Sequence, residues 1–429
     1  MNSSPSVLHI EPTNACNYTC AMCLRSTWSD ASIHHIPVGL FSALARENSS
    51  SLKRLVLYGW GEPLLHPGFV ELLRTARKWL PGNATIHVTT NGSLLSPSLT
   101  KCLVGEHLVD EIIFSCDSLS SLSDSVPGHS LSSGPTGEHL RYLLDLRDPE
   151  TLKIGVQTTI MRSTFRVLPD LVERLSRLGI DHITASHVYP YFSSMAVEMV
   201  YTLMSTEALS ILQGLGDKGW DFMQKHKHKT LTTAHLEASD RDAGANEYLR
   251  VLEQAKKEDI KLNFTMYRQL RRELGLLREV EHVLNTAGET GRRAGIDMEL
   301  PPVFAGLKER RCPYVENSAA CIRSDGEVAP CFKFLYPHKS FLGLHSRSFS
   351  AHSFGNVGTD ALAAIWQSSA YRSFRENLRD MNAHIAWCGD CSFAANNCYF
   401  ITEDTGDCLM NEPFCAECPY SLNLTRCML

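Results

Sequence analysis

The chain has 429 residues, with 41 lysines and arginines against 47 aspartates and glutamates, and a formal net charge of −6. This length predicts two or three domains, and the mild acidity argues against a nucleic-acid or anionic-membrane partner. The sequence shows neither a secretion signal nor an apolar run of membrane-spanning length, so a soluble, cytoplasmic protein is expected. The 15 cysteines are accordingly interpreted as reduced thiols or metal ligands rather than disulfides.

Six β-rich runs alternate with helical patterns over the first 190 residues, which is typical of a parallel sheet built from βα units. The predicted strands are residues 7–11, 55–60, 85–90, 111–115, 153–159 and 182–187. Helices are predicted at residues 68–80, 96–107 and 167–179, where apolar side chains recur at three- and four-residue spacing. Six units are too few for a closed eight-stranded barrel, and functional side chains are expected at the carboxyl ends of the strands.

Three cysteines follow the first predicted strand, Cys16, Cys20 and Cys23, with the spacing C-x3-C-x2-C. Three thiolates this close can hold three irons of a 4Fe-4S cubane and leave the fourth iron open, whereas ordinary ferredoxin-type clusters use four cysteines. The pattern resembles the signature of the radical S-adenosylmethionine (radical SAM) superfamily. That resemblance implies an α/β fold with a partial (β/α)6 barrel, and SAM bound to the open iron. A structural zinc knuckle and three unrelated buried cysteines are the alternatives.

The polar residues at the next strand ends resemble SAM-binding positions of the same family. Gly59, Trp60, Gly61 and Glu62 resemble its Gly-Gly-Glu-Pro motif, where the backbone and the glutamate bind the SAM amino group; a plain glycine-rich turn is the alternative. Further cofactor-binding candidates at strand ends three to five are Asn91, Ser115, Gln157 and Arg162. For Arg162, a bidentate pair with the SAM carboxylate is expected, against the alternative of an exposed loop arginine.

Three residues are candidates for a catalytic role because they follow strand ends near the expected mouth of the barrel: Asp117, His187 and Tyr189. Asp117 is expected beside the SAM ribose or the substrate, or alternatively as a cap of the next segment. For His187, a satisfied core histidine is an equally good interpretation.

Ten cysteines are concentrated near the C-terminus: Cys312, Cys321, Cys331, Cys388, Cys391, Cys398, Cys408, Cys415, Cys418 and Cys427. With the G-x4-C element that ends at Cys331, they resemble the SPASM domain, a cysteine-rich extension that binds two auxiliary 4Fe-4S clusters. The resemblance implies three clusters in all, and eight of the ten cysteines as auxiliary ligands.

The resemblance also implies a partition of these ligands. Cys312, Cys321, Cys331 and Cys408 are expected at the cluster nearer the barrel, and Cys388, Cys391, Cys398 and Cys427 at the outer one. Cys415 and Cys418 can displace some of them, because the spacing departs from the usual pattern. A zinc ribbon on Cys388, Cys391, Cys415 and Cys418 is the competing interpretation.

The expected domains are a partial barrel at residues 1–193, a helical bridging region at 194–301 and a SPASM domain at 302–429. In the bridging region, helical patterns cover residues 246–259 and 266–285. The lysine–histidine run at residues 225–229 is interpreted as a solvated charge run rather than a metal site.

The family resemblance implies reductive cleavage of SAM to a 5′-deoxyadenosyl radical that abstracts hydrogen from an unactivated carbon of a small-molecule or peptide substrate. A flavodoxin- or ferredoxin-type protein is the expected electron donor. Because auxiliary clusters can accept a second electron, we expect dehydrogenation of a natural-product intermediate such as a sugar or aminocyclitol. The alternatives are maturation of a ribosomal peptide by side-chain oxidation or crosslinking, maturation of a tungsten-type metalloenzyme, and a non-catalytic zinc-stapled scaffold.

Overall fold

The structure is a computed structural model that describes residues 4–28, 32–117, 134–225, 242–394, 398–402 and 406–429. Of the lysine–histidine run, residues 226–229 lie outside the described residues. A single large sheet organises the molecule, with the strand order β7-β6-β5-β4-β3-β2-β1-β8-β9. Its strands are β1 (Val7–Ile10), β2 (Arg54–Leu57), β3 (Thr85–Thr90), β4 (Glu111–Ser115), β5 (Lys153–Ile160), β6 (His182–His187), β7 (Asp297–Glu299), β8 (Ala319–Ile322) and β9 (Val328–Ala329).

The six predicted parallel strands are confirmed as β1 to β6, and every neighbouring pair from β7 to β8 is parallel. All four residues of β1 are buried, as are the last three of β2, which is typical of parallel strands covered on both faces. Three short strands extend the sheet beyond the prediction. β7 adds to β6 at one end, and β8 adds to β1 at the other and pairs in turn with β9, so strands from the cysteine-rich segment continue the barrel sheet.

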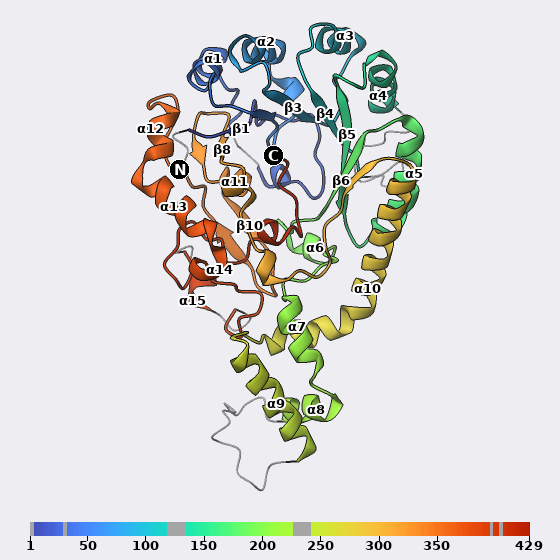
Figure 1. Cartoon of the computed structure of the whole chain (residues 1–429), viewed down its shortest axis with the longest axis vertical. Coiled ribbons are helices and arrows are strands. Elements are labelled where there is room, and N and C mark those ends of the chain that lie inside the picture. Colours follow the sequence, from blue (N-terminus) through green and yellow to red (C-terminus); the bar gives the residue numbers. More distant parts are fainter. Residues whose placement is uncertain (1–3, 29–31, 118–133, 226–241, 395–397, 403–405) are drawn as a thin grey trace.

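Helices cover the outer face of the curved sheet, as Figure 1 shows for α1 to α5. They are α1 (Val38–Glu47), α2 (Phe69–Trp79), α3 (Pro97–Gly105), α4 (Gly134–Leu146) and α5 (Leu168–Leu178). The α3 helix begins at Ser96, whose side chain accepts a hydrogen bond from Leu99 N, with a proline in the first turn. The α5 helix ends at Gly179, whose φ of 83° places it in the left-handed region that favours glycine.

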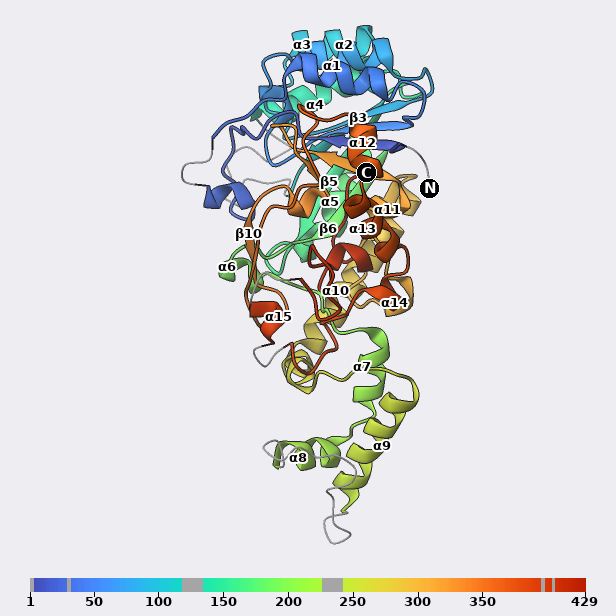
Figure 2. The same cartoon turned by 90° about the vertical axis from the view of Figure 1, so that its left-hand side faces the viewer.

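The bridging region is helical, as predicted, and consists of α6 (Ser193–Ala196), α7 (Thr206–Gln213), α8 (Asp217–Lys225), α9 (Ala243–Lys257) and α10 (Phe264–Arg293). In both views, α8 and α9 project away from the body of the molecule (Figures 1 and 2). The long α10 helix returns along α5, and the ion pair between Arg166, in the turn just before α5, and Glu279 ties the two segments together. None of the described helices, α10 included, is long and apolar enough to cross a bilayer.

The C-terminal segment contains short elements separated by irregular loops. They are α11 (Pro313–Glu316), β10 (His338–Ser340), β11 (Arg347–Phe349), α12 (Leu362–Gln367), α13 (Ser369–Arg379), α14 (Met381–His384) and α15 (Tyr399–Thr402). Several 3-10 turns lie among the loops: η1 (Leu24–Thr27), η2 (Pro63–Leu65), η3 (Phe165–Val167), η6 (Leu307–Glu309), η7 (Phe332–Phe334) and η8 (Pro419–Leu422). The end of the chain lies within the curve of the sheet in Figure 1, so this segment closes the open side of the partial barrel.

Candidate active site and auxiliary cysteine sites

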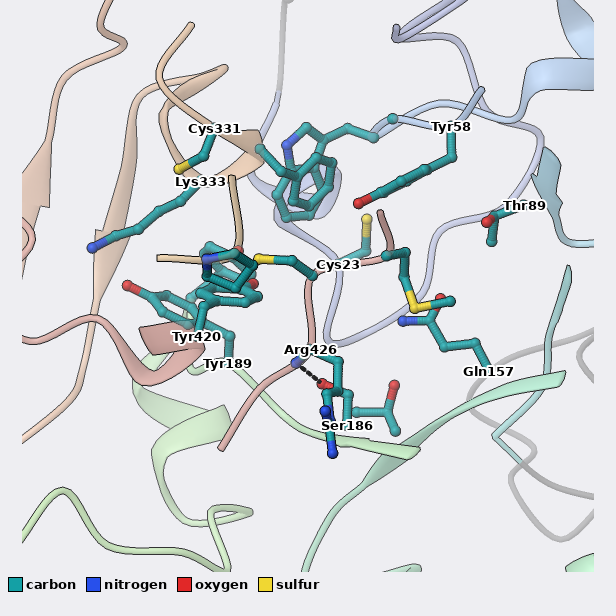
Figure 3. Close-up of a pocket in the computed structure, with 18 of the residues that line it drawn as sticks. Cys23, Tyr58, Thr89, Gln157, Ser186, Tyr189, Cys331, Lys333, Tyr420 and Arg426 are labelled. Atoms are coloured by element: carbon teal, nitrogen blue, oxygen red, sulfur yellow. Dashed lines mark hydrogen bonds between the residues drawn. The ribbon is translucent and has the colours of Figure 1, made fainter. Parts of the chain in front are cut away.

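A cavity of about 310 Å³ lies at the carboxyl ends of β2 to β6 and is closed by the C-terminal segment. Figure 3 shows Cys23 and Cys331, from opposite ends of the chain, on its walls, together with Gln157 and Ser186 from the sheet. This volume is in the range of small-molecule sites. The location matches the expectation that functional side chains gather where the strands end.

The three N-terminal cysteines all line this cavity from the loop after β1. The loop is held by its own hydrogen bonds: Arg25 Nη1 donates to Cys16 O at 3.1 Å, and Ser26 Oγ donates to Cys20 O at 2.7 Å. Burial, and then the neighbouring Cys23, raise the pKa of Cys20 to about 12. Burial also raises the pKa of Cys23 to about 11. Such thiols become thiolates only beside a bound cation, so this all-sulfur set fits an iron–sulfur cluster.

The loop after β2 is pressed against the cysteine loop, which explains both of its glycines. A Cβ on Gly61 would lie 2.2 Å from Thr13 O and 2.5 Å from Ala15 O. A Cβ on Gly59 would lie 2.2 Å from Cγ of Glu11. Only glycine allows this approach of the two backbones, and the two predicted motifs are therefore brought together.

Glu62 is fully buried and joins the ends of β2 and β3. Its carboxylate accepts hydrogen bonds from Thr90 Oγ1 at 2.6 Å, Asn91 N at 2.7 Å and Leu64 N at 3.1 Å. Burial raises the pKa of Glu62, and these donors act in the opposite direction. Asn91 in turn donates to Asn17 Oδ1 at 3.0 Å, inside the cysteine loop. Glu62 therefore supports the cavity wall from within.

Three more of the predicted polar residues meet on the neighbouring strands. Ser115 and Gln157 are register partners at the ends of β4 and β5, and both line the cavity with Asp117. Asp117 Oδ1 accepts a hydrogen bond from Thr159 N at 2.7 Å, so its carboxylate also ties β4 to β5.

Arg162 is not in the cavity, and the role expected for it is wrong. Because β5 continues to Ile160, Arg162 falls in the turn beyond the strand end. Its Nη2 atom donates to Glu273 Oε2 at 2.7 Å on α10, and its side chain lines a separate groove beside that helix.

His187, the last residue of β6, and Tyr189, on the segment that follows, both line the cavity. His187 Nε2 lies 3.1 Å from Pro302 O, and burial lowers the pKa of this imidazole to about 3. The ring is therefore neutral and bound to the backbone. The Tyr189 ring packs against Tyr191 with centroids 4.6 Å apart, and burial raises the pKa of its hydroxyl. The catalytic candidates thus border the cavity, and their roles stay predictions.

Half of the C-terminal cysteines line the same cavity as the N-terminal three. This inner group consists of Cys312, Cys331, Cys415, Cys418 and Cys427. Burial raises the pKa of Cys331, and the other four members of the group raise it further. Five sulfur donors crowded in a buried space fit a four-thiolate cluster with one cysteine to spare.

The outer group consists of Cys388, Cys391, Cys398 and Cys408. Burial raises the pKa of Cys388 most. The nearby charges of Glu417, Cys391, Cys408 and Cys398 raise it further. This grouping differs from the partition expected from the sequence at three residues: Cys408 lies with the outer group, Cys427 with the inner one, and Cys321 does not line the cavity. The cause is long-range, because Arg426 N donates to Ser186 Oγ at 3.0 Å and draws Cys427 toward the barrel.

Cys321 does not line the cavity, although its charge contributes to the raised pKa of Cys427 in the inner group. It lies on β8 as the register partner of His9, and its Sγ is 3.5 Å from His9 Nδ1 and 3.9 Å from Tyr314 Oη. Within the described residues, no three His, Cys, Asp or Glu side chains are arranged as ligands of one metal ion.

Two family models match the chain, the radical SAM superfamily over residues 10–133 and the iron–sulfur cluster-binding SPASM domain over residues 312–392. The chain belongs to the radical SAM superfamily and carries a C-terminal SPASM domain. Radical SAM proteins of this kind use SAM with a 4Fe-4S cluster, and auxiliary iron–sulfur clusters in the SPASM domain. The chain is accordingly an enzyme of the radical SAM SPASM class.

Two curated proteins are similar in sequence. The tungsten-containing aldehyde ferredoxin oxidoreductase cofactor-modifying protein of Pyrococcus furiosus is 27% identical over 425 residues, 98% of this chain and 96% of that protein. The GTP 3′,8-cyclase of Chlorobaculum tepidum is 35% identical over 112 residues, 26% of this chain and 33% of that protein.

Solved structures share the fold at low sequence identity. Streptococcus suis SuiB bound to S-adenosylmethionine aligns with a TM-score of 0.53 and 15% identity, over 92% of this chain and 72% of that one. The enzyme anSMEcpe with bound AdoMet aligns with a TM-score of 0.50 and 12% identity, over 98% and 93% of the two chains. These likenesses confirm the α/β radical SAM partial barrel with its SPASM domain.

The sequence reasoning missed Glu11, which links the radical SAM barrel to the SPASM domain. Its buried carboxylate accepts hydrogen bonds from Trp60 N at 2.8 Å, Ser324 Oγ at 3.0 Å and Tyr336 Oη at 2.5 Å. The available signal was a carboxylate directly after an apolar strand and next to a proline. An acid at the carboxyl end of a barrel strand is a candidate for the site.

Proposed function

We propose that this radical SAM SPASM enzyme modifies the cofactor of a tungsten-containing oxidoreductase. The observation that carries the proposal is the similarity to the Pyrococcus furiosus cofactor-modifying protein, which extends over nearly the full length of both chains. It supports the metalloenzyme alternative more than the dehydrogenation of a sugar or aminocyclitol expected from cluster number.

In this proposal Cys16, Cys20 and Cys23 hold the SAM-binding cluster. When bound, this cluster and SAM supply a 5′-deoxyadenosyl radical that takes one hydrogen atom from the substrate. The loop at residues 59–62 and the strand-end side chains Ser115 and Gln157 hold SAM in place. A flavodoxin- or ferredoxin-type protein supplies the electron that SAM cleavage requires.

Aromatic rings make the cavity wall beside residues 59–62 apolar. Trp60 stacks on Phe332 with centroids 4.6 Å apart and an interplanar angle of 18°, and Tyr191 meets Trp60 edge-on at 5.2 Å. Rings packed on one another in this way exclude water from the wall. An apolar cavity of this kind holds the substrate carbon near SAM, where orientation supplies much of the rate.

The inner cysteine group supports a two-electron outcome, because it opens onto the same cavity as the SAM-binding cysteines. A substrate that gives one hydrogen atom to the radical, one electron to an inner auxiliary cluster and one proton to solvent is oxidised by two electrons in total. An auxiliary cluster with four protein ligands serves as a one-electron acceptor. We therefore propose oxidation of a carbon on the tungsten enzyme's cofactor.

The test is the release of 5′-deoxyadenosine by the anaerobically reconstituted full-length protein with SAM and dithionite. Three additions are compared: the cofactor extracted from a tungsten aldehyde oxidoreductase, the intact oxidoreductase, and an aminocyclitol. We expect the extracted cofactor or the intact enzyme to raise the rate of 5′-deoxyadenosine release. Mass spectrometry should then detect a cofactor product that has lost hydrogen. Stimulation by the aminocyclitol alone contradicts it. A Cys20→Ser variant is the control and gives no deoxyadenosine with any addition.

A further inference from the structure

Two buried cations flank the inner cysteine group. Arg310, at the end of η6, is 6% exposed, and Lys333, within η7, is 3% exposed. Neither forms a salt bridge with a described carboxylate, although the charge of the buried Asp407 acts on Arg310, and Lys333 Nζ has no hydrogen-bond partner among the described residues. A buried charge without a counter-charge is costly, so these two side chains point to an anionic group that completes their surroundings.

Arg310 lies where the inner and outer cysteine groups meet. Its Nη2 donates to Cys415 O at 3.3 Å and to Ala386 O at 2.8 Å, and its Nη1 donates to Ile385 O at 2.8 Å. Cys388 N, just beyond that segment, donates to Ala416 O at 3.0 Å. The guanidinium therefore fixes the two cysteine-bearing loops against each other and brings its charge to both.

Lys333 approaches the inner group from the other side. It lines the cavity with Cys331 and Cys415, and its Nζ lies 4.0 Å from the centroid of Phe349 and 5.2 Å from that of Phe334. Figure 3 shows its side chain leaving the chain beside Cys331. Ring faces partly stabilise an ammonium but do not neutralise it.

Both cations lie beside Cys415. Arg310 Nη2 donates to its carbonyl oxygen, and Lys333 lines the same cavity wall. The fit with a cluster is therefore electrostatic as well as geometric. Four thiolates around an oxidised 4Fe-4S core leave a net negative charge. That charge would supply a counter-charge for Lys333 and would add to the charge of Asp407 near Arg310.

We propose that Arg310 and Lys333 raise the reduction potential of the inner auxiliary cluster, so that this cluster accepts the electron that leaves the substrate. Reduction adds one negative charge to the cluster, and fixed positive charges in a poorly screened interior stabilise the reduced form. The substrate loses that electron together with one proton, and the cluster gains the electron. The direction of electron flow rests on the proposed function, whereas the effect of the charges requires only a bound cluster.

The experiment is a potentiometric EPR titration of the full-length reconstituted protein, without SAM or substrate. The inner-cluster signal is identified by its absence from a Cys331→Ser variant. Lys333→Met is expected to lower the equilibrium constant for reduction at least tenfold, which is about 59 mV for a one-electron couple. Lys339→Met is the matched control, because Lys339 is an exposed lysine on the neighbouring β10 strand, and it should leave the potential unchanged.

The arginine gives an independent pair of variants. Arg310→Gln should lower the potential and Arg310→Lys should not, while Arg311→Gln removes an exposed neighbouring charge as a control. Equal potentials in the Gln and Lys variants, or in Lys333→Met and its control, overturn the proposal. The neutral variants can also fail to retain the inner cluster. In that case, retention of the cluster in Arg310→Lys and Lys333→Arg supports a role for the positive charge, whereas loss of the cluster in all variants overturns that role. Because no substrate is present, failure here is distinct from failure of the proposed function.

Discussion

The glycine-rich loop after β2 contacts the cysteine-bearing loop after β1, and Gly61→Ala is the single substitution that tests this contact best. The new methyl carbon would lie 2.2 Å from Thr13 O and 2.5 Å from Ala15 O, whereas ordinary contacts of a Cβ begin near 3.4 Å. The loops must therefore separate by about 1 Å. This movement also breaks the hydrogen bond from Glu62 N to Ala15 O, which is 2.7 Å long.

Both neighbours of the new methyl group are backbone atoms, so no side-chain rotation relieves the clash. A displacement of about 1 Å at a positioned reacting group costs roughly 100-fold in rate. We therefore expect SAM cleavage to fall by about two orders of magnitude, with a smaller loss of iron, because the auxiliary cysteines lie on other loops. The rate of 5′-deoxyadenosine formation and the iron content per chain measure the two effects separately.

The matched control is Gly105→Ala, at the end of α3, where a Cβ meets nothing within 4 Å. This variant should cleave SAM at the parent rate. If Gly61→Ala does the same, the close approach of the loops does not position the SAM-binding cluster, and the reasoning from this contact is refuted.

Three further predictions follow from individual contacts. Arg162→Ala should leave SAM affinity unchanged in calorimetric titration, because this arginine pairs with Glu273 outside the cavity; a tenfold loss would restore its expected role. Gly155→Ala should destabilise the fold by about 1–3 kcal/mol, since a Cβ would lie 2.1 Å from His182 Nε2; an unchanged melting temperature contradicts this. Burial lowers the pKa of His9 to about 3 from its ordinary 6.5, so the folded protein keeps this ring neutral while the unfolded chain protonates it below pH 6.5. Stability present above that pH should fall by about 2 kcal/mol at pH 5, and denaturant unfolding should show a weaker pH dependence in His9→Gln.

The regular part of the barrel was predictable because its strands carry local signals. The apolar runs that became β3, β4 and β6 gave the observed bounds, while β1 and β2 ended earlier than predicted. The short strands β7, β8 and β9 were not predicted, because two to four residues give little periodicity. The pairing partners of β7 and β8 also lie far away in sequence. Cys321 and His9 are register partners on adjacent strands but lie far apart in the sequence, so no local pattern could predict their contact.

The candidate site divides in the same way. The positions of Cys16, Gly61 and Glu62 at the cavity were predictable, because each residue belongs to a motif contained in a single loop. The grouping of the C-terminal cysteines was not predictable, since it depends on where the last residues of the chain enter the barrel. For Arg162, an error of one residue in the end of β5 moved the side chain from the expected cavity to the outer surface.

The proposed chemistry depends on a cluster that Cys16, Cys20 and Cys23 hold with one iron open to the cavity. EPR spectra of the anaerobically reduced protein, recorded with and without SAM, show whether such a cluster exists. We expect SAM to change the spectrum of one cluster, and we expect this cluster alone to disappear when the three cysteines are replaced by serine. If SAM leaves the spectrum unchanged, or if a SAM-dependent signal survives in the triple variant, these cysteines do not hold the SAM-binding cluster.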